Sequence, residues 1–363
     1  MAITTTSFTA MRELAETLSA NDKLLLSNAI FTNTFLSPDI TERHAVITGV
    51  ATGDVVPILD ESIDYASFPF MSQTECTQNS CDLNIAFSGK KWTLGLIGCR
   101  YDICTKEFTP DFRKFFNENL QVLNNLDMQS QLIMYLQNKI TKNFNGAKYR
   151  VAYFADTSVT TGVNAPLLGE FDGFFTQAEA GSGLKLEFNQ VNPTGQEIYA
   201  ALEEAYANFM DSDWSDREGV VWKMTKKMAS LWVRFLNGLK DKSEYNCECF
   251  SADGLTAMRT YTLAGNLTIL GIPVEIERDL DGVISQLSLD RPYRALLSYR
   301  NNMPIATQLE ENLNEFDIWY NKDTKKVVIE AEALIGASLP TDDYVYIGAE
   351  VGTNSDPEEG GGE

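Results

Sequence analysis

The segment bounded by Cys76 and Cys104 restricts the fold of this chain more than any other part of it. Two runs of alternating apolar residues lie on either side of Gly89-Lys90-Lys91. If those three residues form a hairpin loop, one register fixes every cross-strand pair. The register pairs Ser88 with Trp92, Cys81 with Cys99, and Cys76 with Cys104. We therefore expect an antiparallel hairpin with about ten residues in each strand.

The four cysteines of this hairpin leave three interpretations open. Cys76 and Cys81 are five residues apart, which in a regular strand places their side chains on opposite faces, about 17 Å apart. A single tetrahedral zinc ion could collect all four thiolates only if the strand bent sharply. The other two interpretations are cross-strand disulfides and reduced, packed thiols, and synthesis in the cytoplasm favours reduced thiols.

Length and charge exclude several classes of protein. The 363 residues predict about two domains or one elaborate domain, with a large core. The chain carries 29 Lys and Arg against 51 Asp and Glu, a net charge of −22, which repels polyanions and disfavours a basic nucleic-acid reader. We find no secretory signal and no apolar run long enough to span a bilayer, and we expect a soluble protein.

The residue types that carry most enzyme chemistry are scarce. His44 is the single histidine, so a second imidazole for a metal site or a proton relay is missing, and an ordinary polar role is expected for it. The phosphate-loop, dinucleotide and serine-hydrolase motifs are absent from the sequence. Acidic pairs could serve a hydrolase, but solvated faces are the simpler interpretation: Glu203-Glu204, Asp342-Asp343 and Glu310-Glu311. We expect no catalytic residue, cofactor or metal.

Several local patterns predict helices. Apolar residues recur at helical spacing between residues 1 and 37, where Pro38 ends the pattern. Thr109-Pro110 predicts a helix start, and an apolar stripe continues to Ile140. Thr194 and Glu197 form a capping box. A further amphipathic helix is expected between residues 231 and 239.

Strand patterns occur in the middle of the chain and dominate its last third. Extended runs are expected at residues 149–154, 220–224, 267–274 and 293–299, and a hairpin is expected from residues 316–320 and 326–331. The stretch from Thr341 to Glu363 holds acids but no Lys or Arg, and its end is expected to be flexible.

The order of these elements resembles the major capsid proteins of tailed bacteriophages, the Hong Kong 97-type shell proteins. Local similarities lie in residues 168–174, the Gly271-Ile272-Pro273-Val274 run, residues 297–307 and residues 333–338. Each is of low specificity alone, and their order along the chain carries the resemblance. The resemblance implies an α+β fold with an N-terminal arm, an extended loop, a peripheral domain with a long spine helix, and an axial domain.

The resemblance also implies how the chain is divided. It places the N-terminal arm at residues 1–70, the extended loop at 71–107, the peripheral domain at 108–146 and 309–350, the axial domain at 147–308, and a flexible acidic tail at 351–363. The spine helix would begin near Thr109. The tip of the extended loop would contact a neighbouring subunit through Ser88, Gly89, Lys90, Lys91 and Trp92.

The function implied is structural rather than enzymatic. Hexamers and pentamers of the chain would close an icosahedral virion head around double-stranded DNA, held without sequence specificity and assembled in the host cytoplasm. A portal, a scaffold and auxiliary head proteins would be further partners, and no membrane would be involved. Two alternatives remain open: an encapsulin-type compartment that encloses enzymes, and a hydrolase built on two facing carboxylates.

Overall fold

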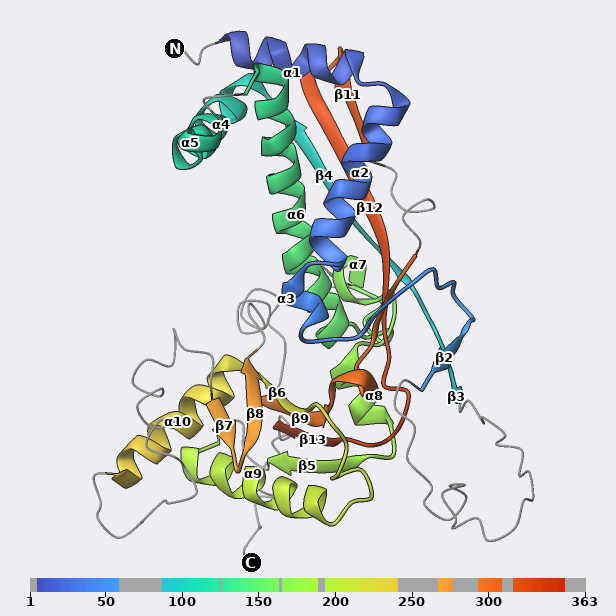
Figure 1. Cartoon of the computed structure of the whole chain (residues 1–363), viewed down its shortest axis with the longest axis vertical. Helices are drawn as coiled ribbons and strands as arrows, with labels where there is room; N and C mark the ends of the chain where they lie inside the picture. The colour runs from blue at the N-terminus through green and yellow to red at the C-terminus, as the bar shows by residue number, and fades with distance from the viewer. Residues whose placement is uncertain are drawn as a thin grey trace, which may run out of the picture. The chain divides into compact units, whose positions relative to one another are not determined.

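The computed structural model describes residues 5–58, 87–123, 126–162, 165–188, 193–240, 267–276, 293–308 and 316–349. The chain divides into two compact units, each built from separated parts of the sequence (Figure 1). Unit 1 comprises Met1–Thr52, Trp92–Phe171 and Ile305–Ala337, and unit 2 comprises Gly53–Lys91, Asp172–Pro304 and Ser338–Glu363.

Unit 1 is organised around one long strand, β12 (Lys326–Ala337). Along one side β12 pairs with β4 (Gly95–Ile103), and on the other with β10 (Ile305–Thr307) and β11 (Asp317–Asn321), all antiparallel. The short strand β1 (Val46–Thr48) adds a parallel pair to β10. The predicted hairpin of residues 316–320 and 326–331 is confirmed as β11 and β12.

Two helices run side by side along this sheet: α2 (Ala20–Phe35) and α6 (Met128–Phe154) (Figure 1). The 27 residues of α6 span about 40 Å at 1.5 Å per residue. Helix α2 begins at a capping box formed by Ser19 and Asp22. The remaining helices of unit 1 are α1 (Thr5–Thr17), α3 (Pro38–Thr41), α4 (Thr105–Glu118), α5 (Leu120–Leu123) and α7 (Ala165–Leu168).

Unit 2 is built on a mixed six-stranded sheet in the order β5-β13-β9-β6-β8-β7. The strands are β5 (Leu184–Phe188), β6 (Val220–Met224), β7 (Leu267–Ile269), β8 (Ile272–Ile276), β9 (Arg294–Tyr299) and β13 (Val345–Ala349). Its helices are α8 (Phe174–Ala180), α9 (Gly195–Met210), α10 (Lys226–Lys240) and a 3-10 turn at Arg300–Asn302.

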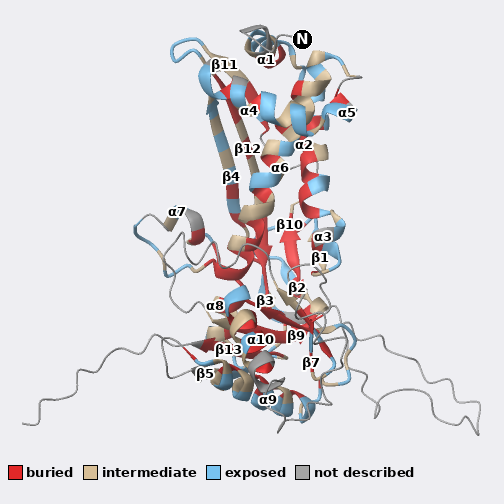
Figure 2. Cartoon of the chain, turned by 90° about the vertical axis from the view of Figure 1, so that its left-hand side faces the viewer, coloured by how far each residue is buried: buried red, intermediate tan, exposed pale blue. Residues whose placement is uncertain are grey.

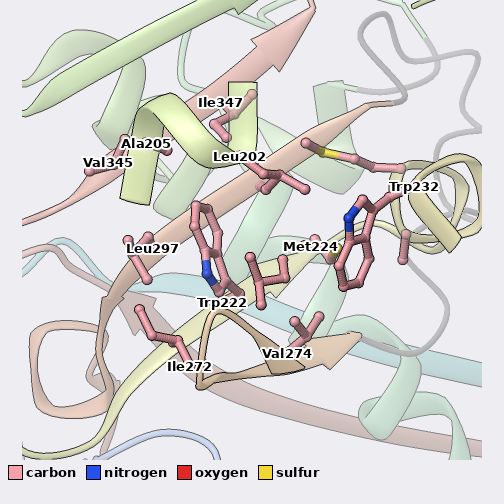
Figure 3. Close-up of a cluster of buried hydrophobic side chains, with 14 of the residues drawn as sticks. Leu202, Ala205, Trp222, Met224, Trp232, Ile272, Val274, Leu297, Val345 and Ile347 are labelled. Carbon is pink, nitrogen blue, oxygen red and sulfur yellow. The ribbon is translucent and has the colours of Figure 1, made fainter. Parts of the chain in front are cut away.

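The core of unit 2 is mostly aliphatic and encloses two fully buried tryptophans. Trp222 on β6 and Trp232 on α10 are fully buried among aliphatic side chains of the sheet and of α9 (Figure 3). Strand β9 crosses this core and is buried along nearly its whole length (Figure 2). The capping box predicted at Thr194 is confirmed, with Glu197 at its third helical position. The helix expected between residues 231 and 239 lies within α10.

Three local predictions were wrong. Residues 149–154 form the last turns of α6 and not a strand, because a short apolar run buried on all sides has no period that separates the two structures. Helix α4 begins at Thr105 with Cys104 as its N-cap, so Pro110 lies inside it. The long helix of unit 1 is α6 and not the helix near Thr109, and it continues through the boundary expected between residues 146 and 147.

Candidate functional site

The residues expected at a loop tip lie in a strand. Strand β3 (Phe87–Lys91) contains Gly89, Lys90 and Lys91, and it pairs antiparallel with β2 (Val55–Pro57). Lys91 lies opposite Val55 and Phe87 opposite Pro57, with a register shift between them. The prediction of a loop at residues 89–91 was therefore wrong. Ser88 belongs to the same strand. Residues 59–86, which connect β2 to β3, are not among the described residues.

The second half of the predicted hairpin pairs elsewhere. Strand β4 forms nine residue pairs with β12, from Ile103 opposite Val327 to Gly95 opposite Ile335. Cys99 lies opposite Ala331, and its expected partner Cys81 lies outside the described residues. The physical reason for the pairing of β4 is burial, because β12 provides a long partner inside a five-stranded sheet, whereas an isolated two-stranded hairpin is marginal in water. The extended loop predicted at 71–107 therefore does not include β4.

Trp92 was expected at the exposed tip and is instead buried. Its side chain is 1% exposed. It begins the three-residue connection between β3 and β4, at the point where the chain passes from unit 2 into unit 1. A neighbouring subunit cannot contact Trp92 without unfolding this part of the chain, so we remove it from the candidate contact residues.

The two lysines of β3 differ in their surroundings. The ammonium of Lys90 donates a hydrogen bond of 2.5 Å to the carbonyl oxygen of Leu339 and lies 3.5 Å from the carboxylate of Asp342. Lys91 is exposed. Lys90 therefore attaches β3 to the segment that follows Ala337, and Lys91 is the lysine of this strand that is open to a partner.

Residues 338–344, which receive Lys90, are themselves held firmly inside unit 2. The Leu339 amide donates to the side chain of Gln177 on α8 at 2.9 Å. The Thr341 amide donates to the side chain of Asn302 at 3.0 Å, and Asp343 forms an ion pair with Arg217 at 3.0 Å. Because this segment is fixed at several points, Lys90 joins the strand pair to a rigid part of unit 2.

Two of the four cysteines of the expected hairpin lie within the described residues. Cys99 and Cys104 are free. Burial raises the pKa of the Cys99 thiol to about 11, so the thiol is protonated and unreactive at neutral pH. Cys76 and Cys81 lie outside the described residues. Across the described part of the chain, no group of three or more His, Cys, Asp or Glu could hold a metal ion.

The other residues that the sequence offered for catalysis are His44 and the three acidic pairs. His44 is 1% exposed, and its Nε2 lies 3.1 Å from the hydroxyl of Tyr153 at the end of α6. Asp342 forms an ion pair with Lys90, and Asp343 forms an ion pair with Arg217. Glu203 and Glu204 lie on the exposed face of α9, and Glu310-Glu311 lies outside the described residues. No helix within the described ranges is long and apolar enough to cross a bilayer.

Comparison of the structure with solved structures identifies the fold. A chain of the satellite phage P4 procapsid, solved with its size determination protein, matches with a TM-score of 0.54 and 10% identity over 90% of this chain and 99% of that chain. The capsid of an empty GTA particle also matches, with a TM-score of 0.45 and 15% identity over 87% of this chain and 90% of that chain. A virus-like particle from Pyrococcus furiosus matches with a TM-score of 0.41 and 8% identity over 89% of this chain and 97% of that chain.

The P4 match is the basis for the fold, since the other two TM-scores are below 0.5. The chain has the α+β Hong Kong 97-type capsid fold. No protein-family model matches the sequence. No curated protein matches it either.

Proposed function

We propose that this chain is the major capsid protein of a tailed bacteriophage, a structural protein that assembles into hexamers and pentamers of an icosahedral head around double-stranded DNA. The observation that carries the proposal is the P4 procapsid match, which spans 90% of this chain and nearly all of the other. Unit 1, with α6 as its spine helix, is the peripheral domain, and unit 2 is the axial domain. The strand pair β2 and β3 is the base of the extended loop.

The net charge of the chain supports a shell that encloses DNA without binding it tightly. A net charge of −22 opposes tight binding to DNA phosphates, so a packed genome would be enclosed without being neutralised by the shell. Portal, scaffold and auxiliary head proteins are the expected partners beside the chain itself. Assembly would take place in the host cytoplasm, and the finished protein would be in the virion.

Expression tests the proposal directly. The chain is produced alone and together with the neighbouring phage genes, and the products are separated by size and examined by negative-stain microscopy. We expect rings and closed shells that form without a cofactor. A stable monomer at all salt and protein concentrations, with scaffold present, would contradict the proposal.

The contents of the particles separate the proposal from an encapsulin-type compartment. Particles purified from infected cells and treated with nuclease should retain double-stranded DNA if the chain is a phage head protein. Particles that contain a folded cargo enzyme and no protected DNA would favour the compartment instead.

A further inference from the structure

Charge is strongly segregated between two neighbouring stretches of unit 2. Residues 197–218 contain seven acids and a single base, Arg217, which is paired with Asp343. Residues 219–240 contain five bases and no acid. Residues 128–155 also lack acids, so the distinctive feature here is that an acidic stretch and a basic stretch follow one another directly. The segregation therefore points to a partner that recognises charge.

The bases of α10 point away from the core. Helix α10 packs into unit 2 through Met228, Ala229 and Trp232, all fully buried. The opposite side is exposed at Lys226, Lys227 and Arg234, which we call the basic face. Lys227 and Arg234 are seven residues apart, two helical turns or about 10 Å along one side of the helix.

The acids also face solvent. Helix α9 packs through Ile198, Leu202, Ala205 and Phe209, and its exposed side carries no Lys or Arg. We call the following exposed residues of α9 and the turns after it the acidic ridge: Glu203, Glu204, Asp211, Asp213, Asp216 and Glu218. Unit 2 thus presents two surfaces of opposite sign on one compact unit.

We propose that the basic face of α10 in one copy of this chain binds the acidic ridge of unit 2 in the next copy, head to tail, around the ring of a capsomer. Each surface repels the same surface on a second copy of the chain. A two-fold contact between like surfaces is therefore disfavoured. Pairing of opposite surfaces repeats from copy to copy and closes a ring when the rotation allows it. This inference rests on the proposed function, because rings are needed only if the chain assembles.

Charge reversal tests the pairing in the full-length chain. One variant carries Lys226→Glu, Lys227→Glu and Arg234→Glu. A second reverses every acid of the acidic ridge, through Glu203→Lys, Glu204→Lys, Asp211→Lys, Asp213→Lys, Asp216→Lys and Glu218→Lys. Each should fold with unchanged circular dichroism and lose assembled material at least about tenfold, since like charges then face one another across the ring. A control with Lys226→Arg, Lys227→Arg and Arg234→Lys keeps the charge and should assemble as the unaltered chain does.

Recombining the two reversals identifies the partner. A chain that carries all nine reversals has complementary surfaces again and should recover rings and shells. An equimolar mixture of the two reversal variants should form mixed hexameric rings, because their surfaces complement each other in alternation. Native mass spectrometry would detect both chains in one ring. Higher salt should weaken assembly of the unaltered chain and of the nine-fold variant alike.

Several results would overturn the inference. Reversal variants of either surface that assemble normally, or a folded nine-fold variant that stays monomeric, would exclude pairing between these surfaces. Normal shells of the first variant that lose only their DNA would assign the basic face to DNA. If the unaltered chain itself fails to assemble, the proposed function is contradicted and this inference falls with it.

Discussion

The cores of the two units differ in form. Unit 2 is a six-stranded sheet with a compact, mostly aliphatic core that contains Trp222 and Trp232. Unit 1 combines a 12-residue strand with a 27-residue helix. Polar side chains fix both units, at Lys148 in unit 1 and at Asn302 and Arg217 in unit 2. The comparison indicates that both units need specific polar contacts, and that unit 2 adds a compact core with two fully buried tryptophans.

The largest expected effect concerns the core of unit 2. Trp232→Ala removes a fully buried indole and should reduce the free energy of unfolding by about 3–5 kcal/mol. Trp319→Ala removes a tryptophan of unit 1 that is only half-buried and should cost clearly less. Urea unfolding of both variants measures the difference. Equal losses would contradict the idea that burial of Trp232 in the core of unit 2 causes the larger cost.

The second effect concerns the end of α2 in unit 1. Lys148 on α6 is fully buried, and its ammonium donates a 2.6 Å hydrogen bond to the carbonyl oxygen of Thr34, in the last turn of α2. This carbonyl has no partner within its own helix, and the cation also faces the negative end of the helix dipole. Lys148→Ala should destabilise the protein by about 2–3 kcal/mol, through the lost hydrogen bond and the cavity.

A variant that keeps the volume of the Lys148 side chain separates the cost of the lost hydrogen bond from the cost of the cavity. Lys148→Met fills the space but leaves the Thr34 carbonyl unsatisfied, so about 1–2 kcal/mol of the loss should remain. Hydrogen exchange should accelerate in the last turn of α2 in both variants. A methionine variant as stable as the unaltered protein would show that packing alone holds α2 on α6.

A smaller effect depends on pH. Asp111 on α4 accepts hydrogen bonds of 2.6 Å from the hydroxyl of Tyr135 and the ammonium of Lys139, both on α6. Burial of the Asp111 carboxyl opposes its ionisation, but these two donors outweigh burial and lower its pKa below the ordinary value. Its stabilising contribution is therefore present above about pH 4 and is lost as the pH falls through the lowered pKa.

Substitution of Asp111 tests this dependence. Asp111→Asn should cost about 1 kcal/mol at pH 7, because the ion pair is partly exposed and screened by solvent. The difference from the unaltered protein should disappear in strongly acidic solution. Thermal unfolding across this pH range measures it, and a cost that does not change with pH would exclude the ionised carboxylate as its source.

The smallest effect compares the two adjacent lysines of β3. Lys90→Met removes the hydrogen bond to Leu339 and the ion pair with Asp342, and should cost about 0.5–1 kcal/mol. Lys91→Met changes an exposed side chain and should leave stability within about 0.5 kcal/mol. Larger loss from the Lys91 variant would contradict the different roles of the two side chains.

Sequence reasoning succeeded where a structure depends on residues close together in the chain. The capping box of Thr194 and Glu197 and the hairpin of β11 and β12 are signals within a few residues. The hairpin around Gly89 failed because β4 pairs with a strand far along the chain. The alternating apolar residues of β4 fit any partner strand that offers an apolar face.

The candidate site was predicted only in part for the same reason. The sequence identified Lys90 and Lys91, but the partners that distinguish them, Leu339 and Asp342, come from a distant segment. The burial of Trp92 likewise depends on the fold of unit 1. Charge segregation between residues 197–218 and 219–240 is visible in the sequence, and the structure adds that α9 and α10 expose these charges.

Electron cryomicroscopy of the purified particles tests the central claim most directly. We predict closed icosahedral shells whose capsomers are rings of five and six copies, with unit 2 around each ring axis and α10 of one copy beside the acidic ridge of the next. Particles without such rings, or a chain that remains monomeric with its phage partners present, would contradict the account.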